Sequence, residues 1–184
     1  MSLSKSKLES EFRKVMDSTD PDFVGWPNTI LAGVNNFVTA YENYAKDAVD
    51  YSADSLLSYN KANFIAALSG LTENSTYIDA ANAMEVGFKA FWIRATFNKL
   101  KLIVAPTPPD VPECPNVGVG TWGAETTSVV VAVDAANSLY STLLPELQKV
   151  NSEDMTDKVA RLANIWHNVT VTTCLLYTSD AADE

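Results

Sequence analysis

The segment GVGTWG at residues 118–123 places glycines at the G-x-G-x-x-G spacing of dinucleotide-binding proteins. Gly118, Gly120 and Gly123 occupy the three positions. In such sites a strand precedes the glycines and a helix follows them, so that backbone amides meet a pyrophosphate at the helix N-terminus. Here the preceding residues are VPECPN, whose prolines cannot form that strand. We therefore interpret the segment as a loop that enters a helix, with Trp122 packed against the body, and predict no nucleotide site.

The sulfur and imidazole groups form no recognisable catalytic or metal-binding pattern. His167 is the only histidine, which excludes a site with several histidine ligands, and no cysteine stands at zinc-site spacing from it. Cys114 could pair with His167 as nucleophile and base. It lies between prolines, however, and nothing in the sequence positions the two together. His167 is more typical of a helix C-terminus, where partial positive charge is favoured.

Two pairs of carboxylates lie close together in the sequence, Asp20 with Asp22 and Glu153 with Asp154. Neighbouring acids at turns and helix starts are typical of solvated caps, where they accept backbone hydrogen bonds or complement the helix dipole. We therefore interpret both pairs as structural. The residue types and spacings together predict a protein that is not an enzyme and that holds no cofactor and no metal ion.

The composition bounds the class of protein. The 184 residues are 47% apolar and 20% charged, with a formal net charge of −10, which fits one globular domain with a sizeable core. An acidic surface repels phosphate groups, so we expect no nucleic-acid partner. No segment reaches the roughly 18 apolar residues of a membrane-spanning helix, and the N-terminus lacks the apolar region of a secretory signal. We expect no membrane partner and a protein made in the cytoplasm.

Apolar residues recur at steps of three and four along most of the chain, which predicts a mainly α fold, a bundle of about five to six helices. The widest apolar face ends in AFWIRATF, and we expect that helix to be central. Ser75 or Thr76 should cap it, with Asp79 in its first turn. Pro145 should kink or break the fifth helix, and Ser152 should cap the sixth. The predicted helices cover residues 6–16, 28–45, 59–71, 73–97, 124–150 and 151–168.

Residues 105–123 form a connection rich in proline and glycine. Five of the eight prolines lie here, and because proline fixes φ and removes a donor, neither a helix nor a central strand can pass through. We expect an extended, partly polyproline course along the surface. KLIV could enter the connection as a short strand, and VTVTT at 169–173 alternates as a strand does. The expected interaction surface comprises Pro106, Pro108, Pro109, Trp122, Val169 and Val171.

The last eleven residues, CLLYTSDAADE at 174–184, do not continue the pattern before them. They resemble, codon by codon, the translation of a transposase mosaic-end sequencing adaptor. We therefore expect a non-native tail on a metagenomic fragment, with a single native domain over residues 1–173. Cys174 would then be foreign, so that Cys114 has no partner for an intrachain disulfide. The strand from Val169 would be truncated, since a lone strand cannot satisfy its own backbone groups.

The order of parts resembles that of a group of small proteins of tailed bacteriophages found in environmental sequence. A short N-terminal helix precedes helices such as ILAGVNNFVTAYENYA and ANFIAAL, and a long helix ends in GFKAFWIRATF. A proline loop of the VAPTPP type, a second helical pair and an ending such as IWHNVTVT follow. The resemblance covers roughly residues 8–173. It implies a virion component, for instance of the neck, tail or baseplate, and it brings no catalytic residues with it.

Two hypotheses on function follow from this resemblance. We expect a structural or assembly protein of the virion, which contacts other phage structural proteins, further copies of itself included. The alternative is a non-structural phage protein that binds a host factor. Its contact surface would be an apolar groove near Trp92 or the connection at 105–123.

Overall fold

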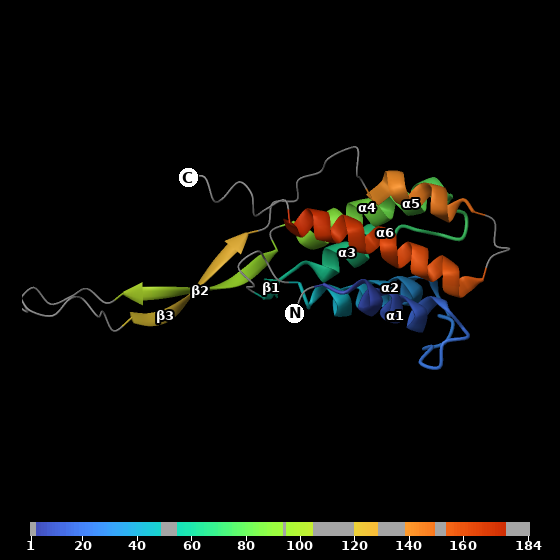
Figure 1. Ribbon diagram of the computed structural model, residues 1–184. Coiled ribbons are helices and arrows are strands. Elements are labelled where there is room, and N and C mark those ends of the chain that lie inside the picture. The colour runs from blue at the N-terminus through green and yellow to red at the C-terminus, as the bar shows by residue number, and fades with distance from the viewer. Residues whose placement is uncertain are drawn as a thin grey trace, which may run out of the picture.

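The computed structural model describes residues 3–48, 55–93, 95–104, 120–128, 139–149 and 154–175. Most of these residues are helical, so the expectation of a mainly α fold is confirmed (Figure 1). The described helices are α1 (Lys5–Met16), α2 (Ile30–Ala45), α3 (Lys61–Leu68), α4 (Tyr77–Trp92), α5 (Leu139–Leu147) and α6 (Met155–Leu175). The described strands are β1 (Leu56–Ser58), β2 (Thr96–Val104) and β3 (Gly120–Ser128).

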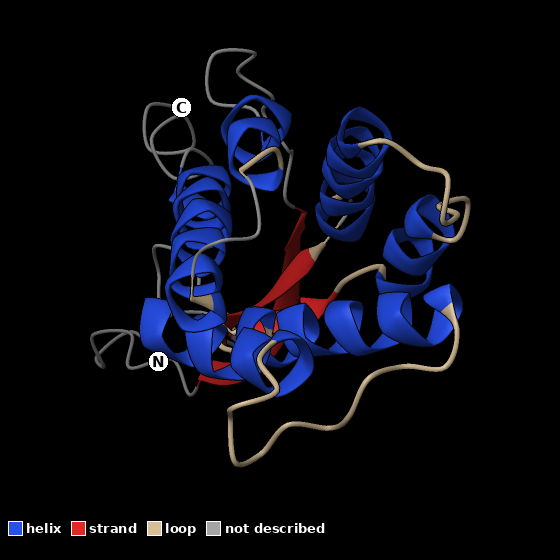
Figure 2. Cartoon of the chain, turned by 90° about the vertical axis from the view of Figure 1, so that its right-hand side faces the viewer, coloured by secondary structure: helices blue, strands red, loops and turns tan. Residues whose placement is uncertain are grey.

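The six described helices follow one another around a common core. Each helix contacts the next along the chain, and α6 returns to contact α1, which closes the series. Figure 2 shows the helices surrounding the core, with the strands behind them. Neighbours in sequence are thus neighbours in space, as is usual in such folds, and this holds even for α4 and α5, which β2 and β3 separate in the sequence.

Aromatic side chains fill the centre of the bundle. Trp166 of α6 is 1% exposed, and aromatic rings from α1, α2, α3 and α4 surround it. Edge-to-face and tilted pairs of this kind add to the stabilisation that burial provides. The rings whose centroids lie 5.2–6.4 Å from that of Trp166 belong to Phe12, Phe37, Tyr41, Phe64 and Phe88.

Side chains cap two of the predicted helix starts. Thr76 accepts a hydrogen bond from the backbone N–H of Asp79, and the Asp79 carboxylate accepts one from the backbone N–H of Thr76. This capping box confirms Thr76 as the cap of α4. At the start of α6, Asp154 Oδ1 accepts from the backbone N–H of Thr156 at 3.0 Å. Ser152, the expected cap, lies outside the described residues.

The central helix is shorter than expected. α4 ends at Trp92, and the chain turns at Ile93, whose ψ is 124°. The prediction that this helix continues through Phe97 was therefore wrong. Residues 96–104, TFNKLKLIV, alternate with a period of two and form β2 instead. The expected KLIV strand is confirmed as the distal part of a longer one.

The sheet has the order β1–β2–β3, and both pairs are antiparallel. Because β3 begins at Gly120, the expected proline-rich connection ends before its last residues, and 105–119 lie outside the described part. The prediction of a helix from residue 124 was wrong for 124–128. These residues pair with β2, as in Phe97↔Thr127, and the β-branched threonines favour a strand. Pro145 lies inside α5, which ends two residues later.

The predicted terminal strand at 169–173 is wrong, because α6 continues through it to Leu175. The alternation of valine and threonine is also compatible with a helix, because residues four apart lie on the same helix face. The hydroxyl of Thr170 donates to the carbonyl of Trp166 at 2.7 Å, a contact between residues four apart that a helix makes possible. Thr170 is fully buried. Tertiary burial therefore outweighs the modest helix penalty of β-branched residues.

Candidate functional site

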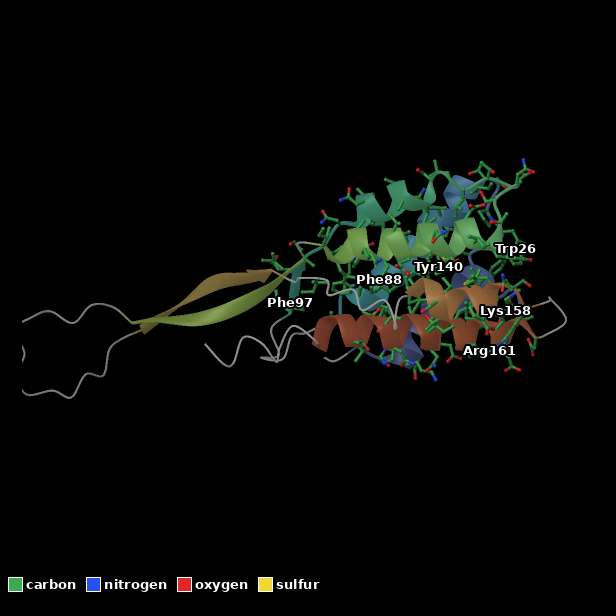
Figure 3. All side chains as sticks on the ribbon, turned by 90° about the horizontal axis from the view of Figure 1, so that it is seen from above. Trp26, Phe88, Phe97, Tyr140, Lys158 and Arg161 are labelled. Carbon is green, nitrogen blue, oxygen red and sulfur yellow. The ribbon has the colours of Figure 1, made fainter. Side chains whose placement is uncertain are left out.

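The strands β2 and β3 form a hairpin that projects from the helical body (Figures 1 and 3). We call this hairpin, residues 96–104 with 120–128, the arm. Its base is fixed to the body by Phe97, which is 3% exposed and belongs to the hydrophobic core. β1 adds a short third strand there, through Leu56↔Phe97 and Ser58↔Thr96. The arm therefore starts from a rigid point in the core and leads away from it.

Beyond its base, both outer edges of the arm are open with respect to the strands that the structure describes. Among the described strands, β2 pairs with β1 only at Thr96 and Phe97, and β3 has β2 as its sole neighbour. The outer edges of 98–104 and 120–126 thus face no described strand. Open edges carry rows of unpaired N–H and C=O groups, which are templates for pairing with another chain.

The sequence of β2 contains both basic and apolar residues. Lys99 and Lys101 alternate with Leu100 and Leu102, and Lys99 is the register partner of Glu125 in β3. Since a two-stranded ribbon alone is only marginally stable in water, a hairpin whose outer edges pair with no described strand is suited to contact with another protein.

The structure separates the residues that were expected to form one interaction surface. Trp122 lies in the arm, at the register position opposite Leu102. Val169 lies in α6 and packs against the hydrophobic core, and Val171 lies one half-turn further along the same helix. Pro106, Pro108 and Pro109 lie outside the described residues.

Two lysines of the arm were missed as candidate site residues. Lys99 was assigned to no element and Lys101 to the start of the short KLIV strand, and the structure places both in β2. The alternation in TFNKLKLIV was the available signal.

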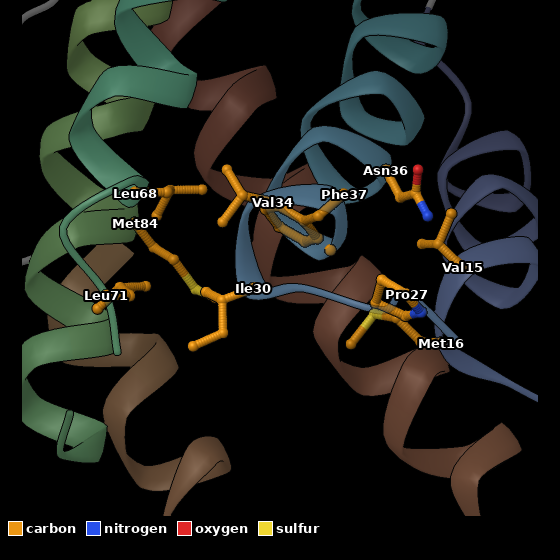
Figure 4. A pocket seen from close by; sticks show the side chains of 11 residues that line it. Val15, Met16, Pro27, Ile30, Val34, Asn36, Phe37, Leu68, Leu71 and Met84 are labelled. Carbon is orange, nitrogen blue, oxygen red and sulfur yellow. The ribbon is translucent and has the colours of Figure 1, made fainter. Parts of the chain in front are cut away.

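A separate apolar cavity of about 280 Å³ lies where α1 to α4 meet (Figure 4). Asn36 is the only polar side chain in its lining. Trp26 lies at the end of the body opposite the arm (Figure 3), and 63% of its surface is exposed. The left-handed φ of 90° at Gly25 fits a glycine in the turn that carries Trp26. The apolar side chains that line the cavity are Val15, Met16, Pro27, Ile30, Val34, Phe37, Leu68, Leu71 and Met84.

A buried carboxylate joins α2 to the region around α3. Glu42 is 8% exposed, and it accepts hydrogen bonds from the Tyr59 hydroxyl at 2.8 Å and from Lys61 Nζ at 2.7 Å. Burial raises the pKa of Glu42, but these hydrogen bonds and the lysine charges outweigh it and hold the pKa below its usual value. Burial, with Glu42 beside it, raises the pKa of Tyr59 to about 12. The cluster therefore holds an ion pair.

His167 lies in the middle of α6 rather than at a helix C-terminus, which corrects the expectation from the sequence. Its Nδ1 shares a hydrogen bond of 2.7 Å with the Tyr44 hydroxyl. Burial lowers the pKa of His167, and the charge of Lys5 lowers it further. The neutral imidazole thus has a structural partner on α2. Cys114, its suggested catalytic partner, lies outside the described residues.

The other candidate groups occupy turns, caps or the core. Asp20 Oδ1 accepts from the backbone N–H of Asp22 at 2.8 Å, which is a turn, as expected. Glu153 is outside the described residues. Trp92 is fully buried, and its Nε1–H donates to the Tyr41 hydroxyl at 2.9 Å. The expectation that Trp92 lies at an apolar groove is therefore corrected, since this side chain is part of the core.

The glycines of the G-x-G-x-x-G segment lie differently from those of a dinucleotide site. Gly120 and Gly123 belong to β3, and Gly118 is outside the described residues. A strand thus follows where a phosphate-binding helix would begin.

Nowhere in the described residues do three or more His, Cys, Asp or Glu side chains converge as metal ligands would. None of the described helices combines the length and apolar content needed to span a bilayer.

Comparison of the chain with protein-family models, with curated proteins and with solved structures returned no match. The arm is the most distinctive feature of the part of the chain that the structure describes.

Proposed function

We propose that this protein is a structural or assembly component of a bacteriophage particle, which acts through protein–protein contacts and without catalysis. The order of its helices and its proline-rich segment resembles that of small proteins of tailed phages. The resemblance favours a neck, tail or baseplate component that is made in the host cytoplasm and ends in the virion.

The arm is the observation that carries this proposal. A rigid helical body provides a fixed base at Phe97, and the hairpin extends from it with open edges beyond that base. Strand addition at such an edge gives many backbone hydrogen bonds to a partner without requiring a deep pocket. Assembly proteins need contacts of this kind, which form between many copies in a fixed geometry.

Mass spectrometry of purified virions tests the proposal. We expect peptides of this protein in particles purified by density gradient, at a constant ratio to the capsid protein. Portal, capsid or tail genes next to its own gene would support the same conclusion. Presence in infected cells together with absence from purified particles would overturn the proposal.

The exposed apolar residues near Trp26 favour a second function, in which this chain is a non-structural phage protein that binds a host factor. Val24, Trp26 and Leu31 are each more than half exposed, and Ile30 lines the apolar cavity nearby. Exposed apolar patches next to a cavity are typical of binding surfaces.

A paired affinity experiment separates the two functions. If the host-factor hypothesis holds, one host protein binds the wild-type chain and is lost with Trp26→Ser, while the virion fraction contains none of the protein. If the virion proposal holds, Trp26→Ser leaves incorporation into particles unchanged, because the arm makes the contacts.

A further inference from the structure

The two strands of the arm differ in charge, so the outer edge of one is complementary to the outer edge of the other. β2 contains Lys99 and Lys101, whereas Glu125 is the only charged residue of β3. Within the hairpin, Lys99 and Glu125 are register partners. Opposite charges across strands stabilise a pair, and like charges oppose it.

The backbone pattern permits the same register on the outer edges. In an antiparallel pair, successive residues point their N–H and C=O groups alternately toward the partner and away from it. Residues that face outward on β2 therefore stand opposite residues that face outward on β3. A β2 strand laid on the outer edge of another β3 in the hairpin register would use the outward groups of both.

Pairing of like edges is less favourable. An antiparallel β2–β2 contact across 98–104 brings the lysines of both copies together, because Lys101 lies at the centre of that segment. A β3–β3 contact would leave the lysine-bearing edge unused. The mixed contact places Lys99 of one copy beside Glu125 of the next and leaves the pair with one β2 edge and one β3 edge, to which further copies can add.

We propose that a second copy of this chain occupies the edge of the arm, with β2 residues 98–104 of one copy pairing antiparallel with β3 residues 120–126 of the next. The contact is heterologous, so copies add head to tail into a ring or a filament. This partner assignment rests on the proposed assembly function and specifies which surface performs it.

Oligomeric state is the first test. The full-length protein at increasing concentration, measured by light scattering after gel filtration and by native mass spectrometry, should form species larger than a dimer. A protein that remains monomeric, or that stops at a dimer, overturns the proposal. This result is independent of the virion measurement, because a monomer that is found in particles would leave the assembly function standing and remove only the arm contact.

A charge exchange tests the contact itself. The double variant Lys99→Glu with Glu125→Lys keeps an opposite pair inside each hairpin, so each chain should fold and self-assemble. In a mixture with the wild type, every mixed contact would place like charges opposite each other. We expect mixed neighbours to be depleted about fivefold relative to random mixing, as measured by native mass spectrometry of isotope-labelled chains.

A matched exchange elsewhere serves as the control. Lys7 and Asp47 form an ion pair on the helical body at 2.6 Å, and Lys7→Glu with Asp47→Lys changes the same number of charges away from the arm. This variant should mix freely with the wild type. Random mixing of the arm variant, with both chains showing wild-type thermal unfolding, would overturn the proposal.

Discussion

At the scale of single residues, Glu42 shows how a carboxylate near the core is retained. Its two oxygens accept from Tyr59 and Lys61, and the depressed pKa means that folding favours the ionised form. The resulting stabilisation is fully present above the unfolded pKa, near 4.5, and is lost as the pH falls through the lower folded value.

We predict that Glu42→Gln lowers the free energy of unfolding by about 1–3 kcal/mol at neutral pH, because the Lys61 ammonium loses its charged partner. As the pH falls from 4.5 through the lower folded pKa, the difference from the wild type should shrink, since the folded wild-type carboxylate then becomes protonated as well. Urea denaturation at several pH values measures both effects. Glu73→Gln, at an exposed loop position, is the control, and an equal loss there would contradict the prediction.

Thr170 is part of a buried chain of hydrogen bonds. The Trp92 indole donates to the Tyr41 hydroxyl, this hydroxyl and that of Thr170 lie 2.8 Å apart, and Thr170 donates to the Trp166 carbonyl. Both hydroxyls are therefore needed to complete this chain of hydrogen bonds.

We predict that Thr170→Val destabilises the fold by about 1–2 kcal/mol, because it leaves the Tyr41 hydroxyl with one buried partner fewer. Thr172→Val is the matched control. The Thr172 hydroxyl also bonds to the carbonyl four residues earlier, at 2.8 Å, but this residue is exposed. Thr170→Val should therefore lower the melting temperature more than Thr172→Val does. Equal melting temperatures would argue against a structural role for the buried hydrogen bonds.

At the scale of the elements, the contact between α3 and α4 depends on Gly87. A Cβ atom at this position would overlap the ring of Phe64, which is fully buried. The ring cannot move away easily, because Phe37, Tyr41, Phe91 and Trp166 surround it.

We predict that Gly87→Ala destabilises the protein by about 1–2 kcal/mol, even though alanine is the better helix former, because overpacking outweighs propensity. Adding Phe64→Leu should reduce this cost in a double-mutant cycle followed by urea denaturation. Gly70→Ala, where a Cβ would meet nothing within 4 Å, is the control. A neutral Gly87→Ala would mean that the two helices are not in close contact.

Periodicity predicted the helices whose packing follows one apolar stripe. Leu8 and Phe12 in α1, and Val38 and Tyr41 in α2, lie three or four residues apart and are all buried. The cap of α4 was also predictable, because a capping box is a local interaction between residues three apart.

The arm and the end of α6 could not be predicted in the same way. β3, GTWGAETTS, contains two glycines and little apolar content, and only its pairing with β2 makes it a strand. The alternation in VTVTT indicated a strand, but the burial of Thr170 against α2 decides for a helix. In both cases partners distant in the sequence outweigh local preference.

The candidate site was predictable only in part. Trp122 was expected to contact other proteins and does lie in the arm, yet Val169 lies against the core. Lys99 and Lys101 were missed as site residues because the apolar face of the predicted helix extended into ATF, residues 95–97. A strand was expected only at KLIV, residues 101–104.

At the scale of the whole molecule, the helical body should fold without the arm. The buried core residues that the structure describes lie in the helices or next to them, and Phe97 is the last of them on β2. The cooperative unit is therefore the bundle.

We predict that replacing residues 99–125 by Asn-Gly, which joins the register partners Asn98 and Thr126 through a two-residue turn, shifts the melting temperature by less than about 4 °C. Circular dichroism at increasing temperature measures the effect. Loss of a cooperative transition would show that the arm belongs to the folding unit and would contradict the prediction.

Thr96 and Ser128 are register partners at the base of the arm, so the chain leaves the body and returns to it at one point. In evolutionary terms, such a hairpin can diverge under its own selection. Changes in its length or charge alter which neighbours a copy accepts, and they require no compensating change in the aromatic core. We expect lineages that carry this body to keep its buried rings while their arms vary with the partners they meet.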